Sequence, residues 1–176
     1  DELPQAGGLG RRQRHGVHRA LDERQQRELG GQSATLDLVD DVVQVAVAAR
    51  EHALTRRQFG RLLCEFQGLQ WKFADLRMKL DAAQLLLYRA AVNADAGLPS
   101  AAETAIAKAY CNQTGFEAAS EAMQVMGGLG YSEESLVEYC FRRTRGWMIA
   151  GGSVEIMKNR IAEDVFGRSF AQRAPA

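Results

Sequence analysis

One stretch of the sequence, Leu69 to Leu87, constrains the possible fold more than any other. Its apolar residues recur at alternating steps of four and three: Leu69, Phe73, Leu76, Leu80, Ala83 and Leu87. This spacing follows the 3.6-residue period of an α-helix and produces one apolar stripe along it. Because such a stripe has to be covered, the sequence predicts a long helix packed against other helices.

Serine residues mark the starts of three further helices. Ser100 with Glu103 three residues later predicts a capping box, and Gly97-Leu98-Pro99 ends the preceding helix. Ser132 precedes two glutamates, which favour the positive end of a helix dipole, and predicts a second start. Ser153 follows a glycine pair and predicts a last helix over about 154–165.

The remaining apolar pattern completes an all-α prediction. In the helix after Ser100 the expected buried side is Ile106, Tyr110, Phe116, Ser120 and Met123. The valines around Val43 alternate and fit a strand or a helix, with helix favoured. No hairpin or strand series is recognisable, so the prediction is an up-and-down four-helix bundle over residues 36–170, followed by a tail at 171–176.

Residues 1–35 differ from the rest of the chain. They are rich in Gly, Arg, Gln and His and have no sustained apolar period, as in loops or disordered segments. The chain begins at Asp1, and no lysine precedes Lys72. We therefore expect a truncated chain whose first segment is unstructured or translated out of frame. His15 and His18 lack further metal ligands nearby, so no metal site is expected.

Charge and cysteine content exclude several classes of protein. The 22 basic and 22 acidic residues cancel, so the positive footprint of a nucleic-acid-binding protein is missing. No apolar run approaches the length of a membrane span. Three widely spaced cysteines, Cys64, Cys111 and Cys140, do not form a disulfide framework, and a reducing cytoplasm is the expected location.

Three short motifs after residue 55 carry a family resemblance. They are Arg56-Arg57-Gln58-Phe59-Gly60, Gln124 to Tyr131 (QVMGGLGY) and Ile149 to Ile156 (IAGGSVEI). Their order and spacing resemble the carboxyl-terminal domain of acyl-CoA dehydrogenases, over about Arg56 to Arg168. The resemblance implies an FAD-dependent α,β-dehydrogenation of an acyl-CoA thioester. It also implies a homo-oligomer (dimer or tetramer) and an electron-transfer flavoprotein as redox partner.

The resemblance assigns expected cofactor contacts to particular residues. Arg56 and Gln58 resemble the residues that reach the FAD pyrophosphate of an adjacent subunit, with Phe59 packing beside it. A guanidinium has forked donors that match phosphate oxygens, and an amide adds a neutral donor. Gln67 and Gln124 resemble further cofactor contacts.

Glycines and the last serine cap complete the implied cofactor site. Gly127 and Gly128, with Gly130, resemble a turn that admits the dinucleotide close to the backbone. Ser153 and Glu155 resemble contacts to the adenosine side, and both also fit plain capping roles.

The catalytic base is the main departure from the family pattern. The commonest pattern has glutamate immediately before Gly152, where this sequence has Gly151. The implied substrate contacts are Gly151 and Gly152, with the Gly151 amide as donor to the thioester carbonyl. Some members carry the base on an earlier helix, which makes Glu28 a candidate. Arg143 also stands where aspartate is usual.

Two alternatives to a dehydrogenase fragment remain open from the sequence. One is a catalytically degenerate helical oligomerisation module, suggested by Gly151 and by the missing partner domains. The other is an acyl-CoA oxidase-like flavoprotein, in which oxygen access decides the product. In every case we expect this chain alone to be inactive.

Overall fold

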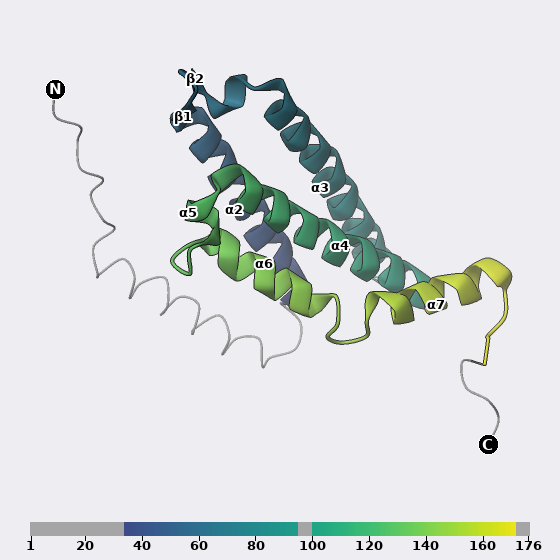
Figure 1. The fold of residues 1–176 in the computed structure, drawn as a ribbon. Coiled ribbons are helices and arrows are strands. Elements are labelled where there is room, and N and C mark those ends of the chain that lie inside the picture. The colour runs from purple at the N-terminus through teal and green to yellow at the C-terminus, as the bar shows by residue number, and fades with distance from the viewer. Residues whose placement is uncertain (1–33, 95–99, 172–176) are drawn as a thin grey trace. The chain divides into compact units, whose positions relative to one another are not determined.

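A computed structural model describes residues 34–94 and 100–171 of the chain, with side chains from residue 41 (Figure 1). The helices are α2 (Ala34–Thr55), α3 (Gln67–Ala94), α4 (Ala101–Met126), α5 (Gly128–Tyr131), α6 (Leu136–Trp147) and α7 (Val154–Phe166). A 3₁₀ helix, η1 (Leu63–Glu65), and two short strands, β1 (Arg57–Gln58) and β2 (Arg61–Leu62), join α2 to α3. The predicted all-α fold is confirmed, and the segment around Val43 is helical.

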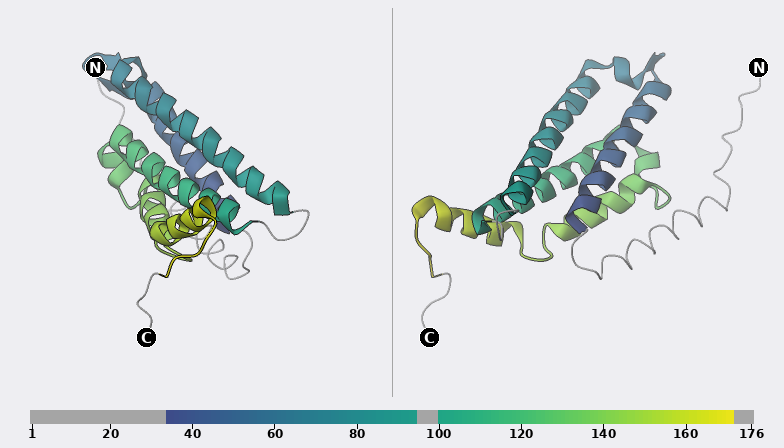
Figure 2. Two further views of the ribbon diagram at one scale, coloured as in Figure 1. Left: turned by 90° about the vertical axis from the view of Figure 1, so that its right-hand side faces the viewer. Right: turned by 180° about the vertical axis from the view of Figure 1, so that it is seen from behind.

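Helix α4 is the central element of the bundle. It contacts α3, α6 and α7 along its length and α5 at its end (Figures 1 and 2). Such close neighbours require small side chains, and the buried residues of α4 are mostly alanines: Ala102, Ala105, Ala107, Ala109, Ala118, Ala119 and Ala122. The predicted buried side is therefore wrong in part. All five residues of that side are only half-buried, because neighbouring backbones leave room mainly for methyl groups: Ile106, Tyr110, Phe116, Ser120 and Met123.

The largest core cluster draws residues from three helices. Val45, Ala49 and Ala53 of α2 pack with Ala119, Ala122 and Val125 of α4 and with Val137 and Cys140 of α6. Leu69 and Phe73, from the predicted α3 stripe, lie against this cluster. Leu76 of the same stripe joins Val42 and Ala118 in a second cluster. The stripe that predicted the bundle therefore does cover the core.

Two of the three predicted serine caps are confirmed. The Ser100 hydroxyl accepts the amide of Glu103 at 3.3 Å, and the Ser153 hydroxyl accepts the amide of Ile156 at 3.4 Å. The prediction for Ser132 is wrong by three residues. Ser135 caps α6 by accepting the amide of Val137, whereas the Ser132 hydroxyl accepts the amide of Glu134 in a local turn.

The expectation that the chain lacks a hairpin is also wrong. β1 and β2 pair antiparallel, with Arg57 opposite Leu62 and Gln58 opposite Arg61. The two turn residues, Phe59 and Gly60, have φ of 51° and 77°. Positive φ at both positions is the arrangement of a type I′ turn, whose twist matches the flanking strands.

Some predictions fall outside the described residues. They concern the helix end at Gly97-Leu98-Pro99, the segment before residue 34, Glu28 and the His15/His18 pair. Within the described ranges, none of the helices has the length and apolar character to cross a membrane.

Candidate functional site

The hairpin between α2 and α3 presents three of the predicted cofactor residues to solvent. Arg56 follows α2, Gln58 belongs to β1, and Phe59 forms the tip. Phe59 is 91% exposed although its backbone lies in the left-handed region, which bulky residues rarely adopt. Neither packing within the described chain nor backbone preference explains a phenylalanine at this position. The side chain is therefore suited to contact a ligand or another chain.

The hydrogen bonds of the hairpin separate structural arginines from free ones. Arg61 donates to the carbonyl of Glu65 at 2.6 Å and lies over the Phe66 ring, and Arg57 reaches the carbonyl of Gly60 at 3.5 Å. Within the part of the chain that the structure describes, the Arg56 side chain has no hydrogen bond or ion pair. Its guanidinium is therefore free to bind an external anion.

The three predicted glutamines are free in the same way. Gln58, Gln67 and Gln124 are exposed, and their amides make no hydrogen bond to any described residue. Gln70, one turn beyond Gln67, instead donates to the carbonyl of Cys64 at 2.9 Å. Arg56 and these three glutamines are thus left without a side-chain hydrogen bond to any described residue.

The glycines after α4 have different roles. Gly127 ends α4 with φ of 60°, and a Cβ added to Gly127 or to Gly128 would have no neighbouring atom within 4 Å. Gly130 is buried, and a Cβ there would lie 3.0 Å from the Cα of Met123. Packing explains Gly130, whereas the open surroundings of Gly127 and Gly128 allow close approach of a ligand to the backbone.

The hairpin and the glycine turn lie at the same end of the bundle. Leu63 and Cys64, directly after the hairpin, pack on the core cluster together with Met123 and Met126 of the last α4 turn. Figure 1 shows the strands and α5 at this end. The structure therefore brings Arg56, Gln58 and Phe59 to the same region as Gln124.

The remaining predicted residues lie in the loop between α6 and α7. Gly151 and Gly152 have φ of 63° and 99°, and Ser153 caps α7. The Glu155 pKa is lowered, first by a hydrogen bond from its own amide and then by the Ser153 hydroxyl. Ser153 and Glu155 therefore already act in the cap, which is compatible with a second role toward a ligand.

Sequence reasoning missed Lys108 of α4. Its ammonium donates to the carbonyl of Ala150 at 2.9 Å and to that of Gly151. Burial lowers the pKa of Lys108. Lys108 is the only charged residue between Glu103 and Glu117, within an alanine-rich run. A single charge in such a run could have marked Lys108 as a candidate functional residue.

The two groups of residues do not converge within one chain. Lys108, beside Gly151, and Gln124, beside the glycine turn, are 16 residues apart on α4. At 1.5 Å per residue this corresponds to about 24 Å along the helix. The candidate residues thus form two separate groups at different levels of α4.

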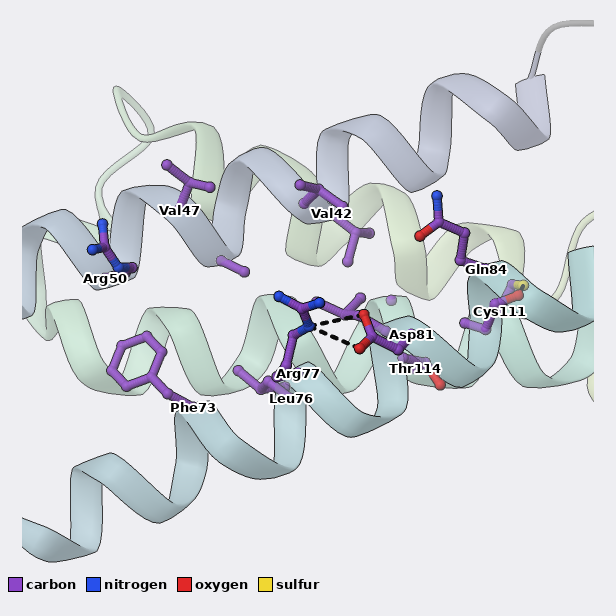
Figure 3. Close-up of a pocket in the computed structure, with 15 residues that line it drawn as sticks. Val42, Val47, Arg50, Phe73, Leu76, Arg77, Asp81, Gln84, Cys111 and Thr114 are labelled. Atoms are coloured by element: carbon purple, nitrogen blue, oxygen red, sulfur yellow. Dashed lines mark hydrogen bonds and ion pairs between the residues drawn. The ribbon is translucent and has the colours of Figure 1, made fainter. Parts of the chain in front are cut away.

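A cavity lies elsewhere, between α2, α3 and α4 (Figure 3). It has a volume of about 440 Å³, and Val42, Val47, Phe73 and Leu76 give it an apolar lining. Arg77 at its edge is paired with Asp81 at 2.8 Å. None of the predicted site residues lines this cavity, and no group of three metal-ligating side chains occurs in residues 34–94 and 100–171.

Comparisons with known proteins agree with the fold and the motifs. The family model for the acyl-CoA dehydrogenase C-terminal domain matches residues 41–166. A 3-sulfinopropanoyl-CoA desulfinase from Paraburkholderia xenovorans (strain LB400) is 31% identical over 150 residues, which cover 85% of this chain and 38% of that protein.

Two solved structures extend the comparison. A glutaryl-coenzyme A dehydrogenase in complex with glutaryl-CoA superposes with a TM-score of 0.74 at 32% identity, over 82% of this chain and 37% of that one. An FAD complex of PigA gives 0.69 at 25% identity, over 73% and 34%. The chain thus spans little more than a third of the length of these relatives. From the family model over residues 41–166 and the shared fold, the chain belongs to the acyl-CoA dehydrogenase family and contains its C-terminal domain.

Proposed function

We propose that this chain is the C-terminal domain of an FAD-dependent enzyme that dehydrogenates an acyl-CoA thioester between its α- and β-carbons. The hairpin is the observation on which this proposal rests. Its tip residue Phe59 is exposed, and the side chains of Arg56 and Gln58 nearby make no hydrogen bond to any described residue. The guanidinium and the amide can donate to a pyrophosphate, and the phenyl ring can pack on an aromatic or apolar surface next to it. Bound FAD would supply the hydride acceptor, and the chain's own residues would hold its phosphates.

The separation of the two partial sites supports a role at a subunit interface. With about 24 Å between them along α4, Arg56 and Gln58 would contact the FAD of an adjacent subunit. Gly151, Ser153 and Glu155 would then face the flavin and substrate bound by their own subunit. The matched residues cover little more than a third of the relatives' length, so other segments of the complete protein would carry the rest of the flavin site.

A stripe on α3 is suited to the oligomer contact that this arrangement needs. Trp71, Met78, Leu85 and Val92 follow one another at steps of seven and are 61%, 64%, 69% and 64% exposed. Seven residues are close to two helical turns, so the four side chains share one face. A face of this kind marks a helix-packing surface, here for a second copy of the chain.

In the loop between α6 and α7, the backbone of Gly151 would contact the substrate. Its amide has no hydrogen-bond partner among the described residues and would donate to the thioester carbonyl oxygen. Negative charge builds on that oxygen when the α-proton leaves, and a fixed donor stabilises it. Gly151 has no carboxylate, so the base must come from another segment, for which Glu28 is the candidate.

The missing carboxylate at Gly151 is also compatible with a second function, the removal of a sulfinate group. One relative is a 3-sulfinopropanoyl-CoA desulfinase, an enzyme named for removing a sulfinate group rather than two hydrogens. Chemistry at the C3–sulfur bond does not require a carboxylate beside C2. We therefore propose, as the alternative activity, hydrolytic cleavage of the C3–sulfur bond, in which water supplies a proton to C3 and an oxygen to the sulfur that leaves as sulfite.

Isotope exchange distinguishes the two functions. The complete protein that carries this domain would be incubated with acyl-CoA in D₂O, and loss of the α-hydrogen followed by mass spectrometry. Dehydrogenation predicts exchange that disappears when the base is removed. No exchange, together with sulfite release from 3-sulfinopropanoyl-CoA, would favour the alternative. Absence of both activities would support a degenerate oligomerisation module.

The chain alone should bind FAD weakly, since its contacts are peripheral to the ring. We expect the flavin to separate from the chain during gel filtration. Co-elution of stoichiometric flavin with the chain would contradict this. An electron-transfer flavoprotein as acceptor and a cytoplasmic location complete the proposal. Reduction of such a flavoprotein by the complete enzyme, in competition with oxygen, would separate a dehydrogenase from an oxidase.

A further inference from the structure

Helix α4 holds the end of α6 and the following loop through two polar side chains. Asn112, which is buried, donates from Nδ2 to the carbonyl of Trp147, the last residue of α6, at 2.8 Å. Lys108, one turn earlier on the same face, donates to the carbonyls of Ala150 and Gly151. Three carbonyls at the end of α6 and in the loop after it are thus satisfied from α4, and a helix C-terminus requires such partners.

The environment of Lys108 is unusual for a lysine. Its ammonium has no carboxylate within ion-pair distance among the described residues, and burial lowers its pKa. The carbonyls of Ala150 and Gly151 are therefore the hydrogen-bond partners that the described residues give this ammonium. A lysine that only anchored the loop could be replaced by a neutral donor such as Asn112, so the charge calls for a further explanation.

Peptide geometry links these carbonyls to the amides of Gly151 and Gly152. In a planar trans peptide the C=O and N–H bonds point in opposite directions. The Ala150 carbonyl shares its peptide with the Gly151 amide, and the Gly151 carbonyl shares its peptide with the Gly152 amide. When Lys108 holds both carbonyls, both N–H groups point away from it. Neither amide has a hydrogen-bond partner among the described residues.

We propose that Lys108 is a positioning residue that orients and polarises the Gly151 and Gly152 amides as donors to the carbonyl oxygen of an acyl thioester. The inference rests on the proposed function and deepens it. A cation at the carbonyl end of a peptide draws electron density from its nitrogen, which strengthens the N–H as a donor. The chain thereby gains a fixed, activated donor pair in a loop that also lacks the usual carboxylate.

The surroundings of the two glycines fit this role. A Cβ on Gly151 would lie 3.1 Å from Nζ of Lys108, and one on Gly152 would lie 2.7 Å from Cε of Met157. Both residues have positive φ, which side chains other than glycine adopt at a cost. The tight packing on the Lys108 side leaves the amide side of the loop as the face that can receive a ligand.

The first test uses the chain itself, without flavin or substrate. Residual dipolar couplings and proton shifts of the Gly151 and Gly152 amides would be measured by NMR in the parent and in Lys108→Met, Lys108→Gln and Lys108→Arg. We expect both amides to reorient and shift upfield in Lys108→Met, with recovery in Lys108→Arg and less in Lys108→Gln. Lys158→Met, an exposed lysine on α7, is the matched control and should leave both amides unchanged.

Two results would overturn the inference. One is unchanged amide couplings and shifts in Lys108→Met. The other is equal disturbance of all α7 amides in every Lys108 variant, which would show that Lys108 only holds α7 in place.

The second test uses the complete enzyme and separates this inference from the proposed function. The infrared carbonyl band of a bound, ¹³C-labelled acyl-CoA should move back toward its solution frequency in Lys108→Met. The kcat should fall about tenfold or more with little change in KM, because loss of a whole donor costs about a hundredfold. NMR effects with no acyl-CoA binding at all would refute the proposed function alone. A normal carbonyl band in Lys108→Met would refute the role of Lys108.

Discussion

Removal of one partner from the buried ion pair between α2 and α6 should strongly destabilise the chain. Asp41 and Arg143 are 3.4 Å apart, and their side chains are 3% and 9% exposed. At an effective dielectric constant of about 20, the attraction is about 5 kcal/mol. Most of it is offset by desolvation, but a single substitution leaves the other charge buried. We therefore expect Asp41→Leu to lower the free energy of unfolding by about 3–5 kcal/mol.

The sequence resemblance led us to expect aspartate at the position of Arg143. The arginine found there pairs with an opposite charge on α2, Asp41. Arg143 also donates to the Tyr139 hydroxyl at 2.9 Å, and this hydrogen bond should persist in Asp41→Leu. The double variant Asp41→Leu/Arg143→Met removes both charges and should regain most of the lost stability, since apolar replacement of a buried pair is often neutral.

Urea unfolding followed by circular dichroism measures these differences. Arg142→Met is the control, because the Arg142 side chain that pairs with Glu138 is 70% exposed, and its removal should change stability by less than about 1 kcal/mol. If Asp41→Leu were as stable as the parent, or if the double variant were no more stable than Asp41→Leu, the assignment of a coupled buried pair would be wrong.

Three further predictions concern thiol chemistry, packing and assembly. Burial raises the pKa of Cys111 to about 11, so the unfolded thiol ionises first as the pH rises from about 9. The parent should therefore lose about 2–3 kcal/mol of stability relative to Cys111→Ser between about pH 9 and 11, and parallel pH profiles in chemical unfolding would contradict this. Gly130→Ala should destabilise by about 1–3 kcal/mol in the same assay, since the methyl would meet the Met123 backbone at 3.0 Å; a neutral effect would contradict the packing argument. Leu85→Lys should shift the molar mass from light scattering toward monomer, whereas the exposed Arg77→Lys should not; equal masses would refute the α3 interface.

Local rules predicted local structure well. Ser100 and Ser153 cap helices because a hydroxyl next to a free amide is stabilising in almost any context. Ser132 and Ser135 both met that rule, and the choice between them depended on a turn that the sequence alone did not specify. The hairpin escaped prediction because its two-residue strands are too short to show alternation, and a phenylalanine stands at a turn position that normally favours asparagine or glycine.

Long-range features were beyond the sequence for a different reason. Asp41 and Arg143 are about a hundred residues apart, and nothing local to either indicates the other. The pairing of Lys108 with the Ala150 and Gly151 carbonyls likewise depends on how α4 and α6 pack. The separation of the candidate cofactor residues into two groups follows from the length of α4, which the motifs did not reveal.

The central claim is that the hairpin of this domain holds FAD, and the FAD dissociation constant of the complete protein tests it most directly. Arg56→Ala would be compared with Arg61→Ala, an arginine of the same hairpin that is engaged with Glu65. Loss of a charge-assisted phosphate contact costs about 1.5–3 kcal/mol, so Arg56→Ala should raise the dissociation constant by about 10- to 100-fold. Arg61→Ala should change it less than about twofold if the two arginines have the roles assigned here. Equal dissociation constants for the parent and Arg56→Ala would contradict the account.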